Sequence, residues 1–98
     1  MPTTTVLTAD AAAVRDTTDT LAPTASVVVR GQRFVPLAVL RAAVDLPPWR
    51  FDRAVRELAD AFHGWLRVDW ASTAADDAAS VRHHGTDFHL FTVDGWCR

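Results

Sequence analysis

The stretch VPLAVLRAAVDLPPWRFDRAVREL, residues 35–58, decides the fold, because it holds two helical patterns separated by a break. Leu37, Leu40 and Val44 stand at i, i+3 and i+7, which predicts an apolar face on a helix of about nine residues. Residues 45–48 then break the pattern with two prolines. The stretch therefore predicts two short helices joined by a sharp turn.

The second helix has the strongest pattern in the chain. Phe51, Val55, Leu58 and Phe62 stand at i, i+4, i+7 and i+11, which predicts a complete core face. Gly64 is expected to be the left-handed residue that ends this helix. The opposite face carries the charged residues Arg50, Asp52, Arg53, Arg56, Glu57 and Asp60. The spacing of four residues predicts the ion pairs Arg53–Glu57 and Arg56–Asp60.

The first 25 residues predict either a helix over roughly residues 9–21 or a mobile arm. Thr8 is suited to cap such a helix, and Val14 and Leu21 are seven residues apart, as one helical face requires. Pro23 is expected to end the helix.

The remaining segments predict short strands. Val27 to Val29 is a β-branched run that leads into a hairpin across residues 30–32, and Pro36 suits the first turn of the helix that follows. Residues 65–70 alternate with a period of two, as do residues 87–93, which predicts two further strands. Residues 71–80 are small and polar, and predict a loop or a single helical turn.

In its order of elements, the chain resembles the winged helix-turn-helix superfamily over about residues 26–94. Residues 35–58 resemble the core of that fold, in which two helices meet across a turn that holds an apolar residue, here Leu46. The strands 65–70 and 87–93 resemble the wing. The turn departs from the usual pattern, because Pro47-Pro48 replaces a residue whose side chain could cap the second helix. The resemblance implies an α+β fold with three helices and a two- to three-stranded antiparallel wing. The domain would span residues 26–98, after an N-terminal arm or helix over residues 1–25.

The resemblance also implies binding to double-stranded DNA, in a transcriptional regulator or a DNA-associated accessory factor. The second helix would enter the major groove, and the wing would contact the backbone or minor groove. The DNA-binding residues expected on the helix are Arg50, Arg53 and Arg56 with Trp49, and those expected on phosphates are Arg30, Arg33 and Arg67. Arginine suits both guanine edges and phosphates. The alternative is a solvated helix face with internal ion pairs.

The distribution of charge along the chain favours DNA binding more than the total charge does. The whole chain has a formal charge of −2, which argues against a highly basic nucleic-acid coat. Residues 30–70, however, carry seven arginines and five acidic residues, a net charge of +2. The segments on either side, residues 1–29 and 71–98, are each net −2, and the second of them holds the acidic pair Asp76-Asp77. All ten basic residues are arginines, so lysine chemistry is excluded.

Catalytic and metal-binding patterns are weak. His83 and His84 are adjacent and should point apart on a strand or loop, and no cysteine or acidic residue completes a recognised ligand spacing with them, His63 or His89. Cys97 lies next to the last residue, which does not suit a nucleophile. The sequence holds no glycine-rich phosphate loop and no Ser-His-Asp signature. We therefore expect no metal, no cofactor and no enzyme activity.

The alternative function is a winged-helix module that binds another protein without binding DNA. Trp49 and Trp96 are the candidate partner-binding residues, because an exposed tryptophan suits the anchor of an interface. A homodimer through residues 8–22 is a further expectation. No run of about 18 apolar residues is present, so no membrane span is expected. The single cysteine excludes an intramolecular disulfide, and a cytoplasmic location is the expectation.

Overall fold

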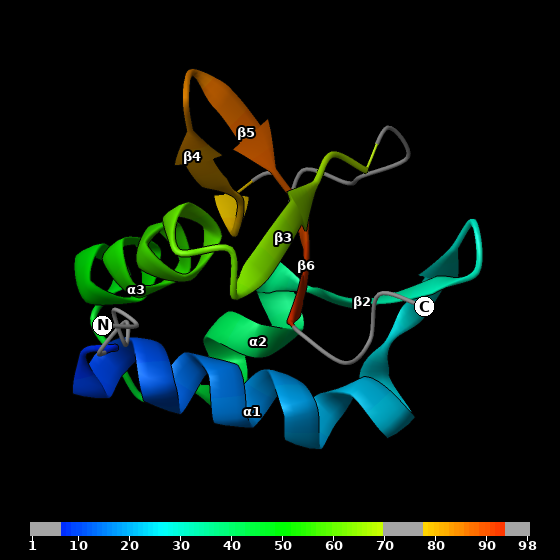
Figure 1. Cartoon of the computed structure of the whole chain (residues 1–98), viewed down its shortest axis with the longest axis horizontal. Coiled ribbons are helices and arrows are strands. Elements are labelled where there is room, and N and C mark those ends of the chain that lie inside the picture. The colour runs from blue at the N-terminus through cyan, green and yellow to red at the C-terminus, as the bar shows by residue number, and fades with distance from the viewer. Residues whose placement is uncertain (1–6, 70–77, 94–98) are drawn as a thin grey trace, which may run out of the picture.

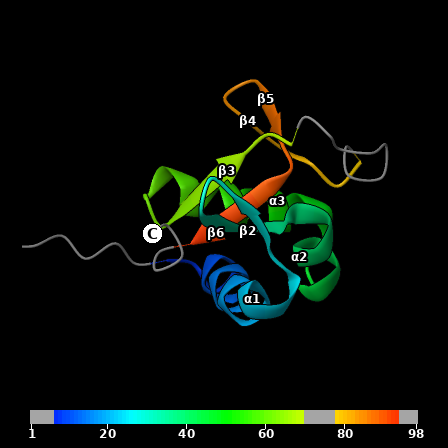
Figure 2. The ribbon, with the colours of Figure 1, turned by 90° about the vertical axis from the view of Figure 1, so that its right-hand side faces the viewer.

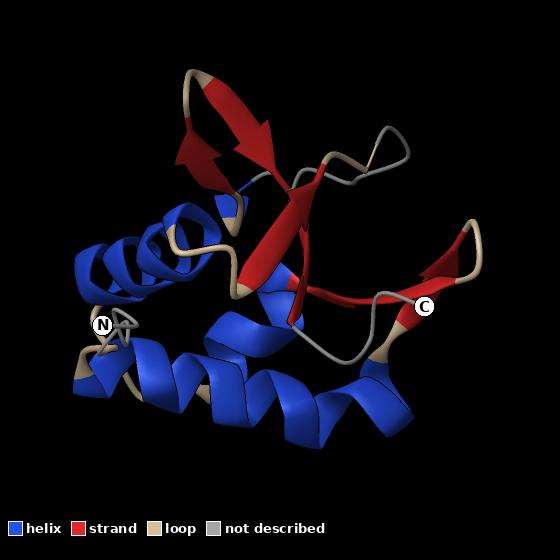
Figure 3. Cartoon of the chain, viewed as in Figure 1, coloured by secondary structure: helices blue, strands red, loops and turns tan. Residues whose placement is uncertain are grey.

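The computed structural model describes residues 7–69 and 78–93, which form a compact α+β domain with three helices and antiparallel sheets (Figure 1, Figure 3). The helices are α1 (Ala9–Ala25), α2 (Leu37–Ala43) and α3 (Pro48–Asp60). The strands are β1 (Val27–Val29), β2 (Gln32–Pro36), β3 (Gly64–Arg67), β4 (Val81–His83), β5 (Thr86–Phe88) and β6 (Leu90–Val93).

The N-terminal segment is a helix from Ala9 onward, and not an arm. The hydroxyl of Thr8 caps α1 by accepting a hydrogen bond from the N–H of Ala11 at 3.2 Å, as predicted. The prediction that Pro23 ends the helix was wrong, because α1 continues to Ala25. Pro23 lies in the last turn, where a missing N–H removes a single hydrogen bond and no long helix follows that a kink could disturb.

The predicted hairpin is confirmed as β1 and β2. Arg30 and Gly31 form its two-residue turn with φ values of +52° and +80°, a left-handed pair that matches the twist of the flanking strands. The larger sheet has the order β1-β2-β6-β3, with every neighbouring pair antiparallel. Figure 2 shows α1 and α2 on one side of this sheet, which buries that face.

The C-terminal strands agree with the prediction only in part. β3 pairs with β6, which confirms the pairing of the two predicted strands. The second of them was predicted as one strand over residues 87–93, which was wrong, because it divides at His89 into β5 and β6. There the His89 N–H donates to the Arg67 carbonyl at 3.0 Å, and its carbonyl accepts from the Leu37 N–H at 2.8 Å. The separate β4–β5 hairpin was not expected from the sequence.

The core lies between the three helices and the sheet. Among its fully buried members are Val14, Val35, Leu37, Leu40, Phe51, Val55, Leu58, Val81, Phe91 and Val93. The predicted face of α3 is confirmed at Phe51, Val55 and Leu58, but the prediction was wrong at Phe62, whose residue surface is 78% exposed. α3 ends at Asp60, and a left-handed backbone at Phe62 (φ +59°) takes this residue off the helical path.

Gly64 was expected to be the left-handed residue that ends α3, which was wrong, because Phe62 has that role. Gly64 is the buried first residue of β3. A Cβ at Gly64 would lie 2.4 Å from Cζ of Phe91, whose ring is fully buried. The absence of a side chain therefore allows β3 to pass over the Phe91 ring.

Replacing Gly64 with alanine should lower the free energy of unfolding by about 1–3 kcal/mol, because the added methyl group overpacks the core. Urea denaturation of the variant measures the loss. Phe91→Leu should be less destabilising in the Gly64→Ala background than in the wild type, since the smaller side chain relieves the overlap. Strictly additive losses in the double variant would contradict this explanation.

Candidate nucleic-acid interface

The outer side of α3 presents Trp49, Arg53 and Arg56 at i, i+4 and i+7, on the side of the helix away from Phe51 and Leu58. Trp49 is 63% exposed, and the side chain of Arg53 is 61% exposed. The guanidinium carbon of Arg53 lies 5.1 Å from the centroid of the Trp49 ring, within the range of a cation–π contact. This stripe combines an exposed aromatic ring with an exposed cation.

The side chain of Arg50 forms an ion pair within the domain. Its Nε and one terminal nitrogen donate to the two carboxylate oxygens of Asp10 on α1, at 2.9 and 2.6 Å. These hydrogen bonds hold the pKa of Asp10 below its ordinary value and raise that of Arg50. Arg53 adds a weaker contact with Asp10 at 3.7 Å. Arg50 therefore joins α1 to α3, and DNA would have to compete with Asp10 for its guanidinium.

Replacing Asp10 with asparagine should make the stability less sensitive to acid. Because the folded-state pKa of Asp10 is lowered, its carboxylate stabilises the fold above the ordinary pKa of about 4, and the contribution is lost as the pH falls through the lowered value. The variant should be less stable than the wild type at pH 7, and the difference in stability should shrink as the pH falls below the ordinary pKa of about 4. Urea denaturation over this pH range measures the difference. Asp16→Asn, an exposed change on the same helix, should show no such convergence.

The carboxylates of α3 bind partners outside the helix. The predicted pairs Arg53–Glu57 and Arg56–Asp60 are not among the ion pairs of the described residues. Glu57 instead accepts hydrogen bonds from the N–H and the hydroxyl of Thr8, both at 2.9 Å. The Nε of Arg56 donates to the Arg82 carbonyl of β4 at 2.6 Å. α3 is thus fastened to α1 on one side and to β4 on the other.

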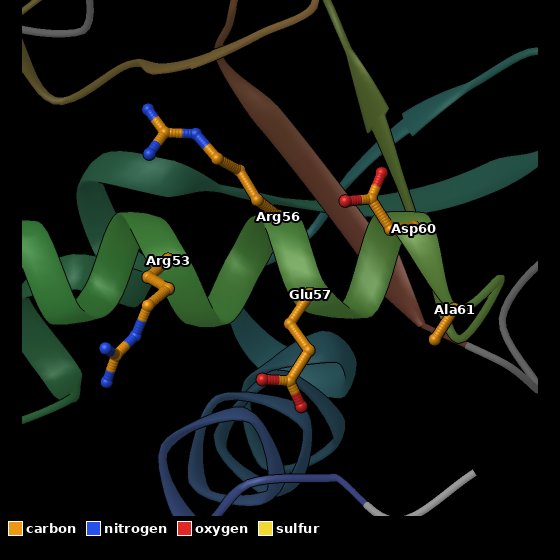
Figure 4. Close-up of a pocket in the computed structure, with 5 residues that line it drawn as sticks. All are labelled: Arg53, Arg56, Glu57, Asp60 and Ala61. Atoms are coloured by element: carbon orange, nitrogen blue, oxygen red, sulfur yellow. The ribbon is translucent and has the colours of Figure 1, made fainter.

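A shallow depression of about 500 Å³ follows the outer face of α3 between these two attachments. Its lining residues are Arg53, Arg56, Glu57, Asp60 and Ala61. Figure 4 shows Arg53 and Glu57 extending from one side of the helix and Arg56 and Asp60 from the other. The surface therefore carries both signs of charge, with its arginines nearer the N-terminal end.

The arginines predicted to contact phosphate do not join this face. Arg30 lies in the β1–β2 turn, and Arg33, exposed on β2, is 3.5 Å from the Ser26 hydroxyl. Figure 1 places this hairpin at the opposite end of the molecule from α3. Arg67 is half-buried at the end of β3. The structure thus brings together Trp49, Arg53 and Arg56 on the outer side of α3, whereas Arg50 is bound to Asp10 and the other three arginines lie elsewhere.

The remaining sequence predictions concern the other tryptophans, Cys97 and the acidic pair at residues 76–77. Trp65 is exposed on β3. Trp96 and Cys97 lie outside the described residues, as do Trp70 and the acidic pair at residues 76–77. Trp49 is therefore the candidate partner-binding residue whose surroundings are described.

The expectation that His83 and His84 point apart was wrong. Their ring centroids are 3.9 Å apart, and both Nε2 atoms face Oδ1 of Asp60, at 3.1 and 3.8 Å. Alternation along a strand does not apply here, since His84 is in the β4–β5 turn with φ +50°. Gly85 was the sequence signal for this turn, because glycine readily adopts the positive φ that the turn requires.

The apolar side of α1 packs within its own chain. Ala11, Val14, Thr18 and Ala22, spaced as one helical face, are buried against the rest of the domain. A homodimer through residues 8–22 would therefore have to use the polar outer side of α1. Neither this 17-residue helix nor the other described helices combine enough length and apolar character to cross a bilayer.

Comparison of the chain with models of known protein families, with curated protein sequences and with solved structures finds no match.

Proposed function

We propose that this chain is a small winged-helix DNA-binding protein, a transcriptional regulator or DNA-associated accessory factor, with the outer face of α3 on the DNA. The order of elements supports the winged-helix assignment, because a short turn joins α2 to α3 and the strands β3 and β6 that follow pair antiparallel. The proposal assigns the DNA-facing role to α3, the second helix of this pair.

The observation that carries the proposal is a stripe on the outer face of α3, in which Trp49 and Arg53 are exposed and Arg56 is half-buried. The N-terminal residues of a recognition helix are the ones that reach base edges, and Trp49 and Arg53 lie in the first half of α3. The planar guanidinium of Arg53 suits a guanine edge or a phosphate, and Trp49 suits contact with a sugar or base.

The local chemistry limits how many phosphates this face would contact. Arg50 is paired with Asp10, and Arg56 shares its guanidinium with a backbone carbonyl. Glu57 and Asp60 add negative charge to the same face. We therefore assign about two to four phosphate contacts to the protein, centred on Arg53 and Arg56.

A salt series tests this proposal. Fluorescence polarisation of labelled duplexes of mixed sequence should show binding at about 50 mM salt, in the micromolar range typical of non-specific complexes. The logarithm of the association constant should fall against log salt with a slope of about −2 to −4, since each phosphate contact adds about −0.9. No binding at the lowest salt, or a slope near zero, would refute DNA binding through this face.

Protein binding through the same face is the second candidate. The exposure of Trp49 beside mixed charges favours it, because a tryptophan surrounded by polar groups is typical of an interface anchor. A native lysate should then yield a partner that Trp49→Ala no longer captures and that Arg15→Glu, a change on α1, still captures. A partner retained equally by both variants would exclude this candidate, as would a DNA site that is footprinted with no partner recovered.

A further inference from the structure

The β4–β5 turn brings two neighbouring imidazoles to one side of the hairpin. His83 is the last residue of β4, and His84 with Gly85 forms a two-residue turn with φ values of +50° and +79°. In an extended strand, neighbouring side chains point to opposite faces. The left-handed backbone at His84 removes that alternation, so the two rings lie 3.9 Å apart with an interplanar angle of 52°.

A carboxylate from another element meets both imidazoles. Asp60 is the last residue of α3, and its Oδ1 lies 3.1 Å from Nε2 of His83 and 3.8 Å from Nε2 of His84. One ligand atom from each of the three residues lies within 4.8 Å of the other two. The cluster therefore joins residues more than twenty positions apart in the sequence through the packing of α3 against β4.

We propose that Asp60, His83 and His84 bind a zinc ion. Zinc takes imidazole nitrogen and carboxylate oxygen at about 2.0–2.2 Å, so two ligands of a tetrahedral ion lie about 3.3–3.5 Å apart. The two measured separations from Oδ1, 3.1 and 3.8 Å, bracket that spacing. Two imidazoles and one carboxylate also suit zinc better than magnesium or calcium, which prefer oxygen ligands.

The exposure of the cluster suits an ion that enters from solvent. The His83 side chain is only 14% exposed, whereas those of Asp60 and His84 are 62% and 81% exposed. The three residues leave the fourth tetrahedral position for water or another donor. Arg56 is one helical turn from Asp60, and its positive charge opposes the ion, so the affinity should be modest.

An ion–pair explanation accounts for less of this arrangement. One histidine is enough to pair with Asp60, and His83 already does so at the shorter distance. The turn geometry accounts for the left-handed backbone of His84, but not for the direction of its ring, whose Nε2 lies 3.8 Å from the same oxygen. A zinc ion would use both rings, and it would fasten the β4–β5 hairpin to the C-terminal end of α3. This inference is independent of DNA binding.

Zinc titration of the full chain, prepared without a histidine tag, tests the site by calorimetry. The wild type should bind one zinc ion per chain, and His84→Asn and Asp60→Asn should each weaken binding at least tenfold. Asn tolerates the left-handed backbone, and Asn-Gly is the preferred sequence for this turn, so His84→Asn should leave the hairpin folded. His89→Asn is the control, because His89 is outside the cluster and Asn keeps an acceptor for its bond from the Asp69 N–H.

Thermal unfolding gives a second readout. At a hundredfold excess over the dissociation constant, zinc should raise the Tm of the wild type and of His89→Asn by about 10 °C or more. His84→Asn should show no comparable shift at that concentration. No zinc binding by the wild type at 100 µM would overturn the proposal, as would equal affinity in the wild type and His84→Asn.

Discussion

Replacing Phe51 with alanine is expected to lower the free energy of unfolding by about 3–5 kcal/mol. Phe51 is fully buried on the inner face of α3, and the guanidinium of Arg41 covers its ring at 4.5 Å from the centroid. The substitution removes apolar contacts and leaves a cavity beneath that cation. A domain of this size has a total stability of about 5–15 kcal/mol, so the loss is a large fraction of it. Urea denaturation measures the change.

Phe62→Ala is the matched control for Phe51→Ala. Both phenylalanines belong to the same apolar pattern in the sequence, but Phe62 is exposed beyond the end of α3. The change at Phe62 should stay within about 0.5 kcal/mol, as is usual at a surface position. Similar losses at the two positions would show that Phe62 is a core residue.

Replacing Arg41 with alanine is expected to cost about 2–3 kcal/mol, the second-largest effect. A terminal nitrogen of Arg41 lies 2.6 Å from Oδ1 of Asp52, and the same nitrogen donates to the carbonyls of Ala79 and Ser80 at 3.2 and 3.4 Å. Both side chains of the ion pair are mostly buried. Alanine would leave the Asp52 carboxylate without its charged partner, and hydrogen bonds to charged groups contribute about 1.5–3 kcal/mol each.

The variant Arg41→Lys tests whether Arg41 stabilises the fold by its positive charge alone or also by the planar shape of its guanidinium. Lysine keeps the positive charge but lacks the planar guanidinium that can stack on Phe51 while bonding to Asp52 and the two carbonyls. We therefore expect it to recover less than half of the loss measured for Arg41→Ala. Arg53→Ala, at an exposed position of α3, should change the stability by less than about 0.5 kcal/mol. Full recovery by lysine would show that charge alone matters at Arg41.

The helical periodicity predicted which faces of the helices are buried, but not where each helix ends. Phe51, Val55 and Leu58 continue the same spacing as Phe62, and nothing in that spacing shows that the chain becomes left-handed at Phe62. The error at Pro23 has the opposite direction, because α1 continues for two residues beyond the proline. In both cases the end of the helix depends on packing that a periodic pattern does not contain.

The contacts of the candidate site depend on residues that are distant in the sequence. Charges four residues apart predicted pairs within α3, whereas Arg50 and Glu57 bind Asp10 and Thr8, which are 40 and 49 residues away. The docking of α1 on α3 places these partners, so a local pattern could not predict them. The exposed stripe itself was predictable, because Trp49 and Arg53 lie on the side of the helix opposite its apolar face.

The most direct test of DNA binding through α3 compares Arg53→Glu with Arg15→Glu on mixed-sequence duplexes at about 50 mM salt. The two variants change the net charge equally, but Arg15 lies on α1. If Arg53 contacts DNA, its reversal should weaken binding at least tenfold, since a good arginine contact contributes about 1–3 kcal/mol and the new carboxylate repels phosphate. Arg15→Glu should stay within about threefold of the wild type. Equal affinities of the two variants would contradict the proposal that α3 faces the DNA.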